Sequence, residues 1–355
     1  MATLIIPCAG KSSRYPGIKP KWLFTHPDGK LMLEKSVAPF LNNKKIKNKI
    51  ITITKIIENK FQVKFLINQM FGNQLKVLVL NSQTKSASET VMKTIDYFKL
   101  KGQILVKDSD NFFMIDPKFN LLNKNFIAGV DISKHPEVSN IHQKSFLKLN
   151  NKNQIIDIEE KKIISDKICI GLYSFGSSKD FIYHFKNCSK NIKNNEIYLS
   201  FVVKSMINSN NLFLYTEGIN YEDYGTFTDW LSIRRMYRTF FVDLDGVIFK
   251  NKGKYGKKNW DTINEVINKN TKTLLKLNIH GAQIVFVSAR PEKYQRKLTV
   301  ELKKIGFLNF KLLLGLNHSQ RILINDYYLT NPNPSAVAIN ISRDDENLNQ
   351  LIQSL

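Results

Sequence analysis

Residues 3–14 decide the fold of the first part of the chain. They read Thr3-Leu4-Ile5-Ile6-Pro7-Cys8-Ala9-Gly10-Lys11-Ser12-Ser13-Arg14. A short apolar run that ends at proline and glycine is typical of a buried strand. Cations follow the glycine at Lys11 and Arg14, and again at Lys19 and Lys21. Backbone N–H groups in such a turn can surround phosphate oxygens, and fixed cations offset the charge that develops in phosphoryl transfer. The stretch therefore predicts a strand that leads into a phosphate-binding turn.

The alternation of strand-like and helix-like segments continues outward from this stretch. We expect strands at 3–7, 49–54, 75–80, 103–106 and 168–175, and helices at 33–41, 57–69 and 88–98. A polar turn is expected at 150–154. This βαβ rhythm predicts an α/β fold with a mainly parallel sheet.

The rhythm begins again near residue 239. The second set of expected strands is 239–244, 284–287, 321–325 and 337–341, with helices at 260–277 and 292–304. A chain of 355 residues fits two domains, because a domain has roughly 100 to 200 residues. The junction is expected in the basic segment Ser232–Arg238, which gives domains at 1–236 and 237–355.

Composition excludes several classes of protein. The apolar fraction of 43% and the charged fraction of 23% are close to globular averages, which argues against disorder and against a fibrous protein. No run of about 18 apolar residues occurs, and the amino terminus lacks the pattern of a secretory signal, so a cytoplasmic protein is expected. The three cysteines form no C-x-x-C pair and the six histidines no H-E-x-x-H motif, so neither a disulfide framework nor a zinc site of these types is predicted.

The charge of the chain is strongly basic, with 53 Lys and Arg against 30 Asp and Glu and a net charge of +23. Such a charge favours anionic partners, which include nucleic acid, phosphorylated metabolites and a membrane surface. The basic residues are not gathered into one stripe with interleaved aromatics, and Lys and Asn are abundant throughout the chain. Background composition therefore also explains the charge, and nucleic acid is not the favoured partner.

The first turn shares features with two known phosphate-binding patterns. The tail Gly10-Lys11-Ser12 fits a Walker A motif only if a glycine stands five positions before Gly10, where the chain has Ile5. The turn instead resembles the first loop of the nucleoside-diphosphate-sugar pyrophosphorylases, which reads A-G-x-G-[ST]-R-x-x-P…P-K. The matching residues are Ala9-Gly10, Ser13-Arg14, Pro16 and Pro20-Lys21, while Ser12 replaces the second glycine. These enzymes are nucleotidyltransferases with a glycosyltransferase-A-like (Rossmann-like) sheet.

Later segments follow the order of motifs in the same family. Asp110, in Lys107-Asp108-Ser109-Asp110-Asn111, and Asp223, in Asp223-Tyr224-Gly225-Thr226, resemble its two magnesium-binding aspartates. Glu160-Lys161 and Gly171-Leu172-Tyr173 resemble the elements that hold the sugar and its phosphate, although Lys162 replaces a proline. The resemblance implies that Arg14 and Lys21 stabilise the reacting phosphates and that Gly10, Gln83 and Ser88 bind the nucleotide. For Ser88, a helix N-cap is an equal alternative.

The second domain begins with a different motif. Phe240-Phe241-Val242-Asp243-Leu244-Asp245-Gly246 is an apolar strand that ends in two aspartates and a glycine. It resembles the D-x-D-G signature of the haloacid dehalogenase (HAD) superfamily. The second motif, a strand that ends in a phosphate-binding Ser or Thr, resembles Phe286-Val287-Ser288-Ala289-Arg290. The fourth, a strand that ends in an acidic metal ligand, resembles Ile322-Leu323-Ile324-Asn325-Asp326, and Arg321 and Lys311 are both candidates for the third.

The HAD resemblance implies roles for these residues. Asp243 would be the nucleophile and Asp245 the general acid and base. Magnesium would be held by Asp243, Asp326 and the main-chain carbonyl of Asp245, and the substrate phosphate by Ser288 and Arg321. The segment after Asp245 is too short for a large cap. A HAD-like Rossmannoid domain without a large cap is therefore expected, and a degenerate, structural domain is the alternative.

Together these features predict a bifunctional, magnesium-dependent enzyme. A nucleotidyltransferase would join a nucleoside triphosphate to a sugar or polyol phosphate, and a phosphatase would act on a phosphorylated precursor, in capsule or lipopolysaccharide synthesis. One alternative is that the two activities are not consecutive steps and that the phosphatase removes an inhibitory or proofreading phosphate. The others are a nucleic-acid-binding or end-processing protein and a scaffold without turnover. The base, the sugar or polyol, the order of the two reactions and the formation of homo-oligomers stay open.

Overall fold

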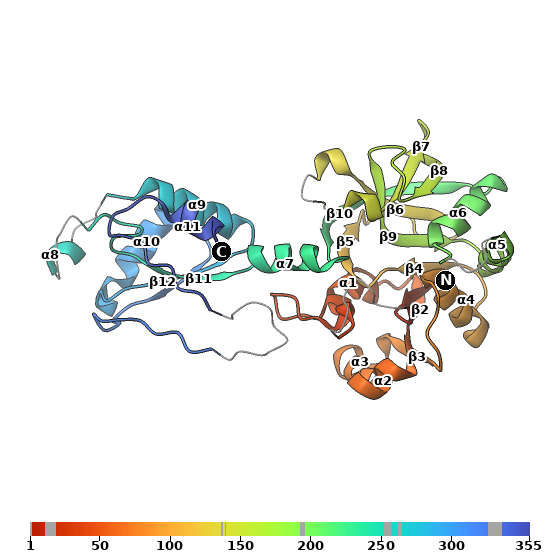
Figure 1. The fold of residues 1–355 in the computed structure, drawn as a ribbon, viewed down its shortest axis with the longest axis horizontal. Coiled ribbons are helices and arrows are strands. Elements are labelled where there is room, and N and C mark those ends of the chain that lie inside the picture. The colour runs from red at the N-terminus through yellow and green to blue at the C-terminus, as the bar shows by residue number, and fades with distance from the viewer. Residues whose placement is uncertain are drawn as a thin grey trace. The chain divides into compact units, whose positions relative to one another are not determined.

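The structure is a computed structural model that describes residues 2–10, 19–135, 138, 140–191, 196–251, 257–261, 265–325 and 336–355. The chain forms two compact units, Met1–Trp230 and Leu231–Leu355 (Figure 1). Helix α7 (Phe227–Met236) runs from the first unit into the second. The boundary was expected after residue 236, at the end of this helix, whereas the two units divide after Trp230, within it.

The first unit is built on one large mixed sheet. Its described strands are β1 (Ala2–Pro7), β2 (Ile46–Thr54), β3 (Lys76–Leu80), β4 (Ile104–Lys107), β5 (Asn111–Ile115), β6 (Phe126–Asp131), β7 (Ser145–Leu149), β8 (Gln154–Glu160), β9 (Lys167–Phe175) and β10 (Phe213–Asp223). Their order is β3-β2-β1-β4-β9-β6-β10-β8-β7, and β5 pairs with β10. Strands β1 to β4 are parallel, as expected, but β9 lies antiparallel between β4 and β6. The prediction of a mainly parallel sheet is therefore correct only for the amino-terminal half.

Helices cover both faces of this sheet. They are α1 (Met32–Leu41), α2 (Lys55–Phe61), α3 (Val63–Phe71), α4 (Ala87–Phe98), α5 (Ser178–Asn191) and α6 (Leu199–Asn208). Side chains alternate across β1, so that Leu4 and Ile6 pack with α1 and α3, while Ile5 packs with α4 on the other face. The single helix expected at 57–69 is two helices, because Gln62 adopts a left-handed φ of 48° that ends α2.

The second unit contains a three-stranded parallel sheet. Strands β11 (Thr239–Asp243), β12 (Gln283–Val287) and β13 (Phe310–Leu313) lie in this order, with helices α8 (Lys257–Trp260), α9 (Asn268–Ile279), α10 (Gln295–Ile305) and α11 (Leu348–Gln353). The second α/β sheet is thus confirmed. The helix expected at 260–277 is wrong in its first half, because Val266 pairs with Phe249 and α9 begins only at Asn268.

Two strand predictions in the second unit are wrong. Residues 321–325 and 337–341 are irregular, and Ile322 and Ile324 are 75% and 91% exposed. The third strand is formed instead by Phe310–Leu313, which pairs with β12. An apolar run alone does not specify which strand it pairs with. Here the segment Phe310–Leu313, which follows α10 directly, pairs with the free side of β12.

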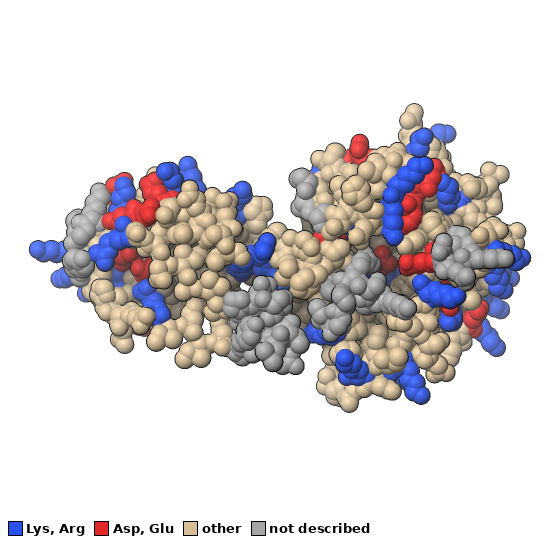
Figure 2. All heavy atoms as spheres, in the orientation of Figure 1, with Lys and Arg blue, Asp and Glu red and all other residues tan. Residues whose placement is uncertain are grey.

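None of the described helices has the length and apolar character needed to cross a membrane. Figure 2 shows Lys and Arg side chains spread over the drawn face of each unit, with Asp and Glu among them. The view agrees with the absence of a single basic stripe in the sequence.

Candidate active sites

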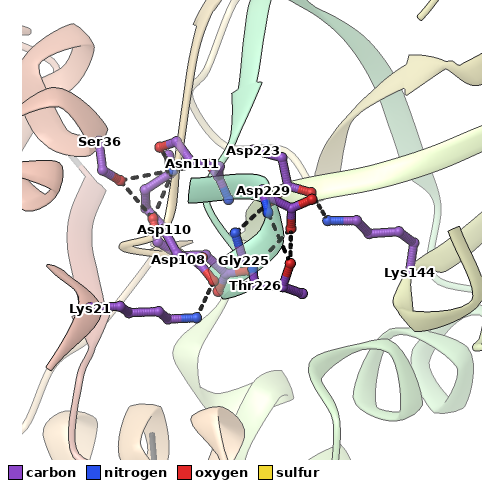
Figure 3. Close-up of polar contacts among 11 residues, drawn as sticks. Lys21, Ser36, Asp108, Asp110, Asn111, Lys144, Asp223, Gly225, Thr226 and Asp229 are labelled. Atoms are coloured by element: carbon purple, nitrogen blue, oxygen red, sulfur yellow. Dashed lines mark hydrogen bonds and ion pairs between the residues drawn. The ribbon is translucent and has the colours of Figure 1, made fainter. Parts of the chain in front are cut away.

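The two aspartates expected to bind magnesium lie at one place in the first unit. Strand β5 begins directly after Asp110, and β10 ends at Asp223. The two strands are antiparallel, with Asp223 opposite Asn111, and the backbone N–H of Tyr224 donates to the carbonyl of Asp110 at 2.8 Å. Residues distant in the sequence are thus neighbours, and Figure 3 shows both side chains in one cluster of polar contacts, with Lys21 at Asp110 and Lys144 at Asp223.

Each carboxylate forms an ion pair with a lysine. Lys21, in the 3-10 turn η1 (Lys21–Leu23), donates to Asp110, and Lys144 donates to Asp223. The backbone N–H of Gly225 also donates to Oδ1 of Asp223, at 2.9 Å. Burial alone would lower the pKa of Lys144, but the negative charges of Asp223 and Asp110 outweigh it and raise the pKa, so the ammonium stays protonated.

A third lysine fixes the turn that carries Asp110. Lys107 is fully buried, and its ammonium donates to the carbonyl of Asp108 at 2.7 Å, to the hydroxyl of Ser36 at 3.0 Å and to Asn111. Burial lowers its pKa to about 8. Because all of its donors have partners inside the protein, Lys107 acts as an internal support for the aspartate turn and not as a surface cation.

Gly171 lies against the same turn. Its φ is +79°, and a Cβ at this position would lie 2.5 Å from Oδ2 of Asp108 and 2.7 Å from Nδ2 of Asn111. The carbonyl of Gly171 accepts from the backbone N–H of Asp108 at 2.8 Å. Tyr173, from the same G-x-Y element, is buried. The structure therefore places Gly171 behind the aspartate turn and Tyr173 in the core.

The nucleotide-binding residues predicted from sequence are only partly brought together. Arg14 lies outside the described residues. Gln83 is exposed beside the turn after β1, where its side-chain amide donates to the carbonyl of Gly10 at 3.5 Å. Ser88 is buried and donates to the carbonyl of Ile197. The N-cap interpretation of Ser88 is wrong, because Ser86 caps α4.

The Glu160-Lys161 pair lies on the strand next to Lys144. The carboxylate of Glu160 accepts from the hydroxyls of Ser145 and Ser200 at 2.5 and 2.6 Å. The ammonium of Lys161 donates to the hydroxyl of Tyr198 at 2.7 Å, and its backbone N–H donates to the carbonyl of Lys144 at 3.0 Å. Strands β7 and β8 thus bring Lys161 beside the lysine that reaches Asp223.

The donor set of this site fits magnesium. Magnesium is bound in proteins through one or two carboxylates together with substrate phosphates and water. Asp110 and Asp223 supply two carboxylates from adjacent strand ends, and no third carboxylate, histidine or cysteine completes a metal-binding group within the described part of the chain. Asp110 and Asp223 are therefore the residues that would hold the ion.

Sequence analysis did not identify Lys107 or Lys144 as parts of this site. Lys107 opens the aspartate motif but carries no signal of its own, and Lys144 lies in a polar segment without a recognisable pattern. Lysine is abundant in the chain, so residue type gave no signal, and only the pairing of β7 with β8 and of β5 with β10 reveals their positions.

The second unit places its aspartates at the end of β11. The guanidinium of Arg290 donates to both carboxylate oxygens of Asp245, at 2.9 and 2.5 Å, and the side chain of Asn259 donates to Oδ1 at 3.0 Å. Ser288, directly after β12, is 2% exposed. Asp326 lies outside the described residues. The role of Arg290 was missed, although Ser288-Ala289-Arg290 was recognised as a motif.

The environment of Asp243 makes its carboxylate harder to ionise than a free aspartate. Burial raises its pKa and the charge of Asp245 adds to the effect, while the guanidinium of Arg321, 3.1 Å away, opposes it. Arg321 was expected to hold the substrate phosphate, and here it contacts the expected nucleophile. A carboxylate that is costly to ionise gains from a nearby cation, and Arg321 supplies one.

Comparison with solved structures shows the fold of the first unit. A nucleoside-diphosphate-sugar pyrophosphorylase from Vibrio cholerae RC9 matches 66% of this chain over 100% of its own length, with 19% identity and a TM-score of 0.56. A Bacillus anthracis protein provisionally assigned as a glucose-1-phosphate thymidylyltransferase, in complex with a sucrose, matches 66% of this chain over 94% of its own length, with 19% identity and a TM-score of 0.51. No protein-family model and no curated protein sequence matches the chain. The amino-terminal two-thirds of the chain therefore have a fold like that of sugar-phosphate nucleotidyltransferases.

Proposed function

We propose that the first unit is a magnesium-dependent nucleotidyltransferase. It joins the nucleoside monophosphate part of a nucleoside triphosphate to the phosphate of a sugar or polyol and releases diphosphate. The observation that carries the proposal is the antiparallel pairing of β5 with β10, which brings Asp110 beside Asp223 at the edge of a nucleotidyltransferase-like sheet.

The reaction needs no nucleophilic side chain. An oxygen of the acceptor phosphate attacks the α-phosphorus of the triphosphate, and the bond from that phosphorus to the bridging oxygen of the diphosphate breaks. Lys21 lies beside Asp110 and stabilises the charge of the crowded phosphates, with Arg14 as its expected partner. A magnesium ion held by Asp110 and Asp223 would offset the charge of the triphosphate. Lys107 and Gly171 keep the aspartate turn in place.

For the second unit we propose a HAD-type phosphatase that acts on a phosphorylated precursor of the same pathway. Asp243 attacks the phosphorus and forms an aspartyl-phosphate, while Asp245 protonates the leaving oxygen and then activates the water that hydrolyses the intermediate. Arg290 fixes the position of the Asp245 carboxylate through two hydrogen bonds. Ser288 and Arg321 lie at the same end of the sheet for the substrate phosphate, and Asp326 is the expected further metal ligand.

The two proposed sites are separable by mutation. Asp110→Ala should abolish diphosphate release from the nucleoside triphosphate and leave phosphate release intact, whereas Asp243→Asn should do the reverse. Asp96, exposed on α4, provides the control Asp96→Ala, which should change neither activity. Loss of both activities in either active-site variant, with the protein still folded by circular dichroism, would refute the assignment of two sites.

The proposed pathway is the synthesis of a nucleotide-activated sugar or polyol in the cytoplasm, for capsule or lipopolysaccharide assembly. Consecutive enzymes in one chain would keep the intermediate near both sites. Assay of a mixture of the phosphorylated precursor and the triphosphate tests this: the conjugate should form from the precursor with the wild type and not with Asp243→Asn.

A further inference from the structure

Lys144 has a position that the proposed chemistry does not yet use. It directly precedes β7, and its ammonium is in contact with Oδ2 of Asp223 (Figure 3). The two side chains are only 17% and 10% exposed, so the pair is largely removed from water. Removing two charges from water costs free energy, and their mutual attraction offsets this cost only when the geometry is good and further hydrogen bonds are made.

The contacts of Asp223 show what a metal ion would displace. Oδ1 of Asp223 already accepts a hydrogen bond from the backbone N–H of Gly225 at 2.9 Å. Oδ2 is the oxygen to which Lys144 donates. Oδ2 is therefore the oxygen of Asp223 that has no backbone donor in these contacts. A cation that binds Asp223 together with Asp110 would compete with the ammonium of Lys144 for it. Metal and ammonium compete for this oxygen.

The displaced ammonium needs another anion within reach. Burial makes an unpaired ammonium costly, so Lys144 would need a new partner if a metal ion displaced it from Asp223. Lys161, which directly follows β8, belongs to the element that resembles the sugar-phosphate-binding segment, and its N–H donates to the carbonyl of Lys144 at 3.0 Å. The acceptor phosphate is therefore expected on this side of the site. The ammonium of Lys161 is itself held by the hydroxyl of Tyr198 at 2.7 Å. Of these two lysines, Lys144 is the one that contacts Asp223.

We propose that Lys144 exchanges between two anions: it neutralises Asp223 when the metal is absent and binds the acceptor phosphate when the metal is present. The inference rests on the proposed nucleotidyltransferase function, because that function brings a phosphate to the metal. Within that function, it makes the acceptor phosphate the second partner of the Lys144 ammonium. The competition for Asp223 can be measured with metal alone.

The first test measures the binding of Mn²⁺ to the full chain by electron paramagnetic resonance. Lys144→Met should bind Mn²⁺ about five to ten times more tightly than the wild type, because the competing cation is gone. The control is Lys148→Met, at an exposed lysine on β7, the strand that follows Lys144, and it should bind Mn²⁺ like the wild type. In an Asp223→Asn background, Lys144→Met should leave the Mn²⁺ affinity unchanged. Comparison of the two single variants with the double variant also removes any contribution of metal bound in the second unit. Unchanged or weaker binding in Lys144→Met would overturn the exchange.

The second test adds inorganic phosphate as the probe for the acceptor. Phosphate should tighten Mn²⁺ binding in the wild type and in Lys148→Met, and should do so several-fold less in Lys144→Met. Lys144→Arg keeps the charge and should restore part of the effect, which distinguishes a missing cation from a disturbed fold. An equal effect of phosphate in all variants would overturn the role of Lys144 in phosphate binding.

The outcome for Lys144 can be separated from that for the proposed function. If the wild type forms diphosphate and Lys144→Met leaves the KM for the acceptor unchanged, the inference fails and the nucleotidyltransferase stands. If the wild type forms no diphosphate while the metal and phosphate binding follow the pattern above, the proposed function fails and the exchange stands.

Discussion

Substitution of Gly171 tests whether the aspartate turn depends on close packing from β9. In Gly171→Ala the new Cβ would meet Oδ2 of Asp108 at 2.5 Å, Cβ of Asp108 at 2.8 Å and Nδ2 of Asn111 at 2.7 Å. Contacts this short force the turn to shift, at a cost of about 1–3 kcal/mol. The φ of +79° adds about 1 kcal/mol, since a residue with a Cβ is strained in this region.

Gly102→Ala is the matched control for this variant. Gly102 has a nearly identical φ of +83°, but nothing lies within 4 Å of the position of its Cβ. It therefore incurs only the backbone cost of about 1 kcal/mol. The difference between the two variants isolates the clash, and we expect Gly171→Ala to be less stable than Gly102→Ala by about 1–3 kcal/mol.

Two assays measure the effect. Urea denaturation gives the free energy of unfolding of the first unit, and Mn²⁺ titration reports whether Asp110, which lies between the displaced Asp108 and Asn111, still binds metal. We expect Mn²⁺ affinity to fall about tenfold in Gly171→Ala, which corresponds to about 1.4 kcal/mol, and to be unchanged in Gly102→Ala. Equal stability and equal metal affinity in the two variants would refute the argument that Gly171 holds the turn.

Further predictions concern Lys107 and the second unit. Lys107→Met should destabilise the first unit by about 2–4 kcal/mol, because it leaves the acceptors on Ser36 and Asn111 without a donor. The pKa of Lys107 is lowered from 10.5 to about 8 in the folded protein. Between these two pH values the unfolded chain therefore binds more protons than the folded one. The wild type should gain stability relative to Lys107→Met as the pH rises from about 8 to 10.5. A stability difference that is constant with pH in urea denaturation would contradict this. Arg290→Lys keeps the positive charge but loses the two hydrogen bonds to Asp245. Phosphate release should fall about tenfold or more, while diphosphate release is retained. Normal phosphate release would show that Arg290 does not position Asp245.

The parts of the fold that could be predicted from sequence are those with local signals. Strand β1 and its turn follow from an apolar run that ends at Pro7 and Gly10, and helix α4 follows from regular apolar spacing. The partnership of Asp110 and Asp223 was available only through resemblance, because antiparallel pairing of distant strands leaves no trace in either segment. The strand expected at 321–325 was wrong for the same reason: its apolar residues suit a strand, but pairing is decided elsewhere in the chain.

The lysines of the first site show a second limit of sequence reasoning. Lys107 and Lys144 are indistinguishable in type from the many exposed lysines of this basic chain. What separates them is burial beside carboxylates, which depends on the packing of β4, β5, β7 and β10. A charged residue is buried only where it has partners, so the positions of such residues become informative only after the sheet is known.

The most direct test of the central claim is diphosphate release, measured with magnesium for each nucleoside triphosphate against a panel of phosphorylated sugars and polyols. The account predicts that at least one pair of substrates gives release that requires magnesium and is lost in Asp110→Ala but kept in Asp243→Asn. Release that survives in Asp110→Ala, or none across the whole panel from the folded wild type, would contradict it.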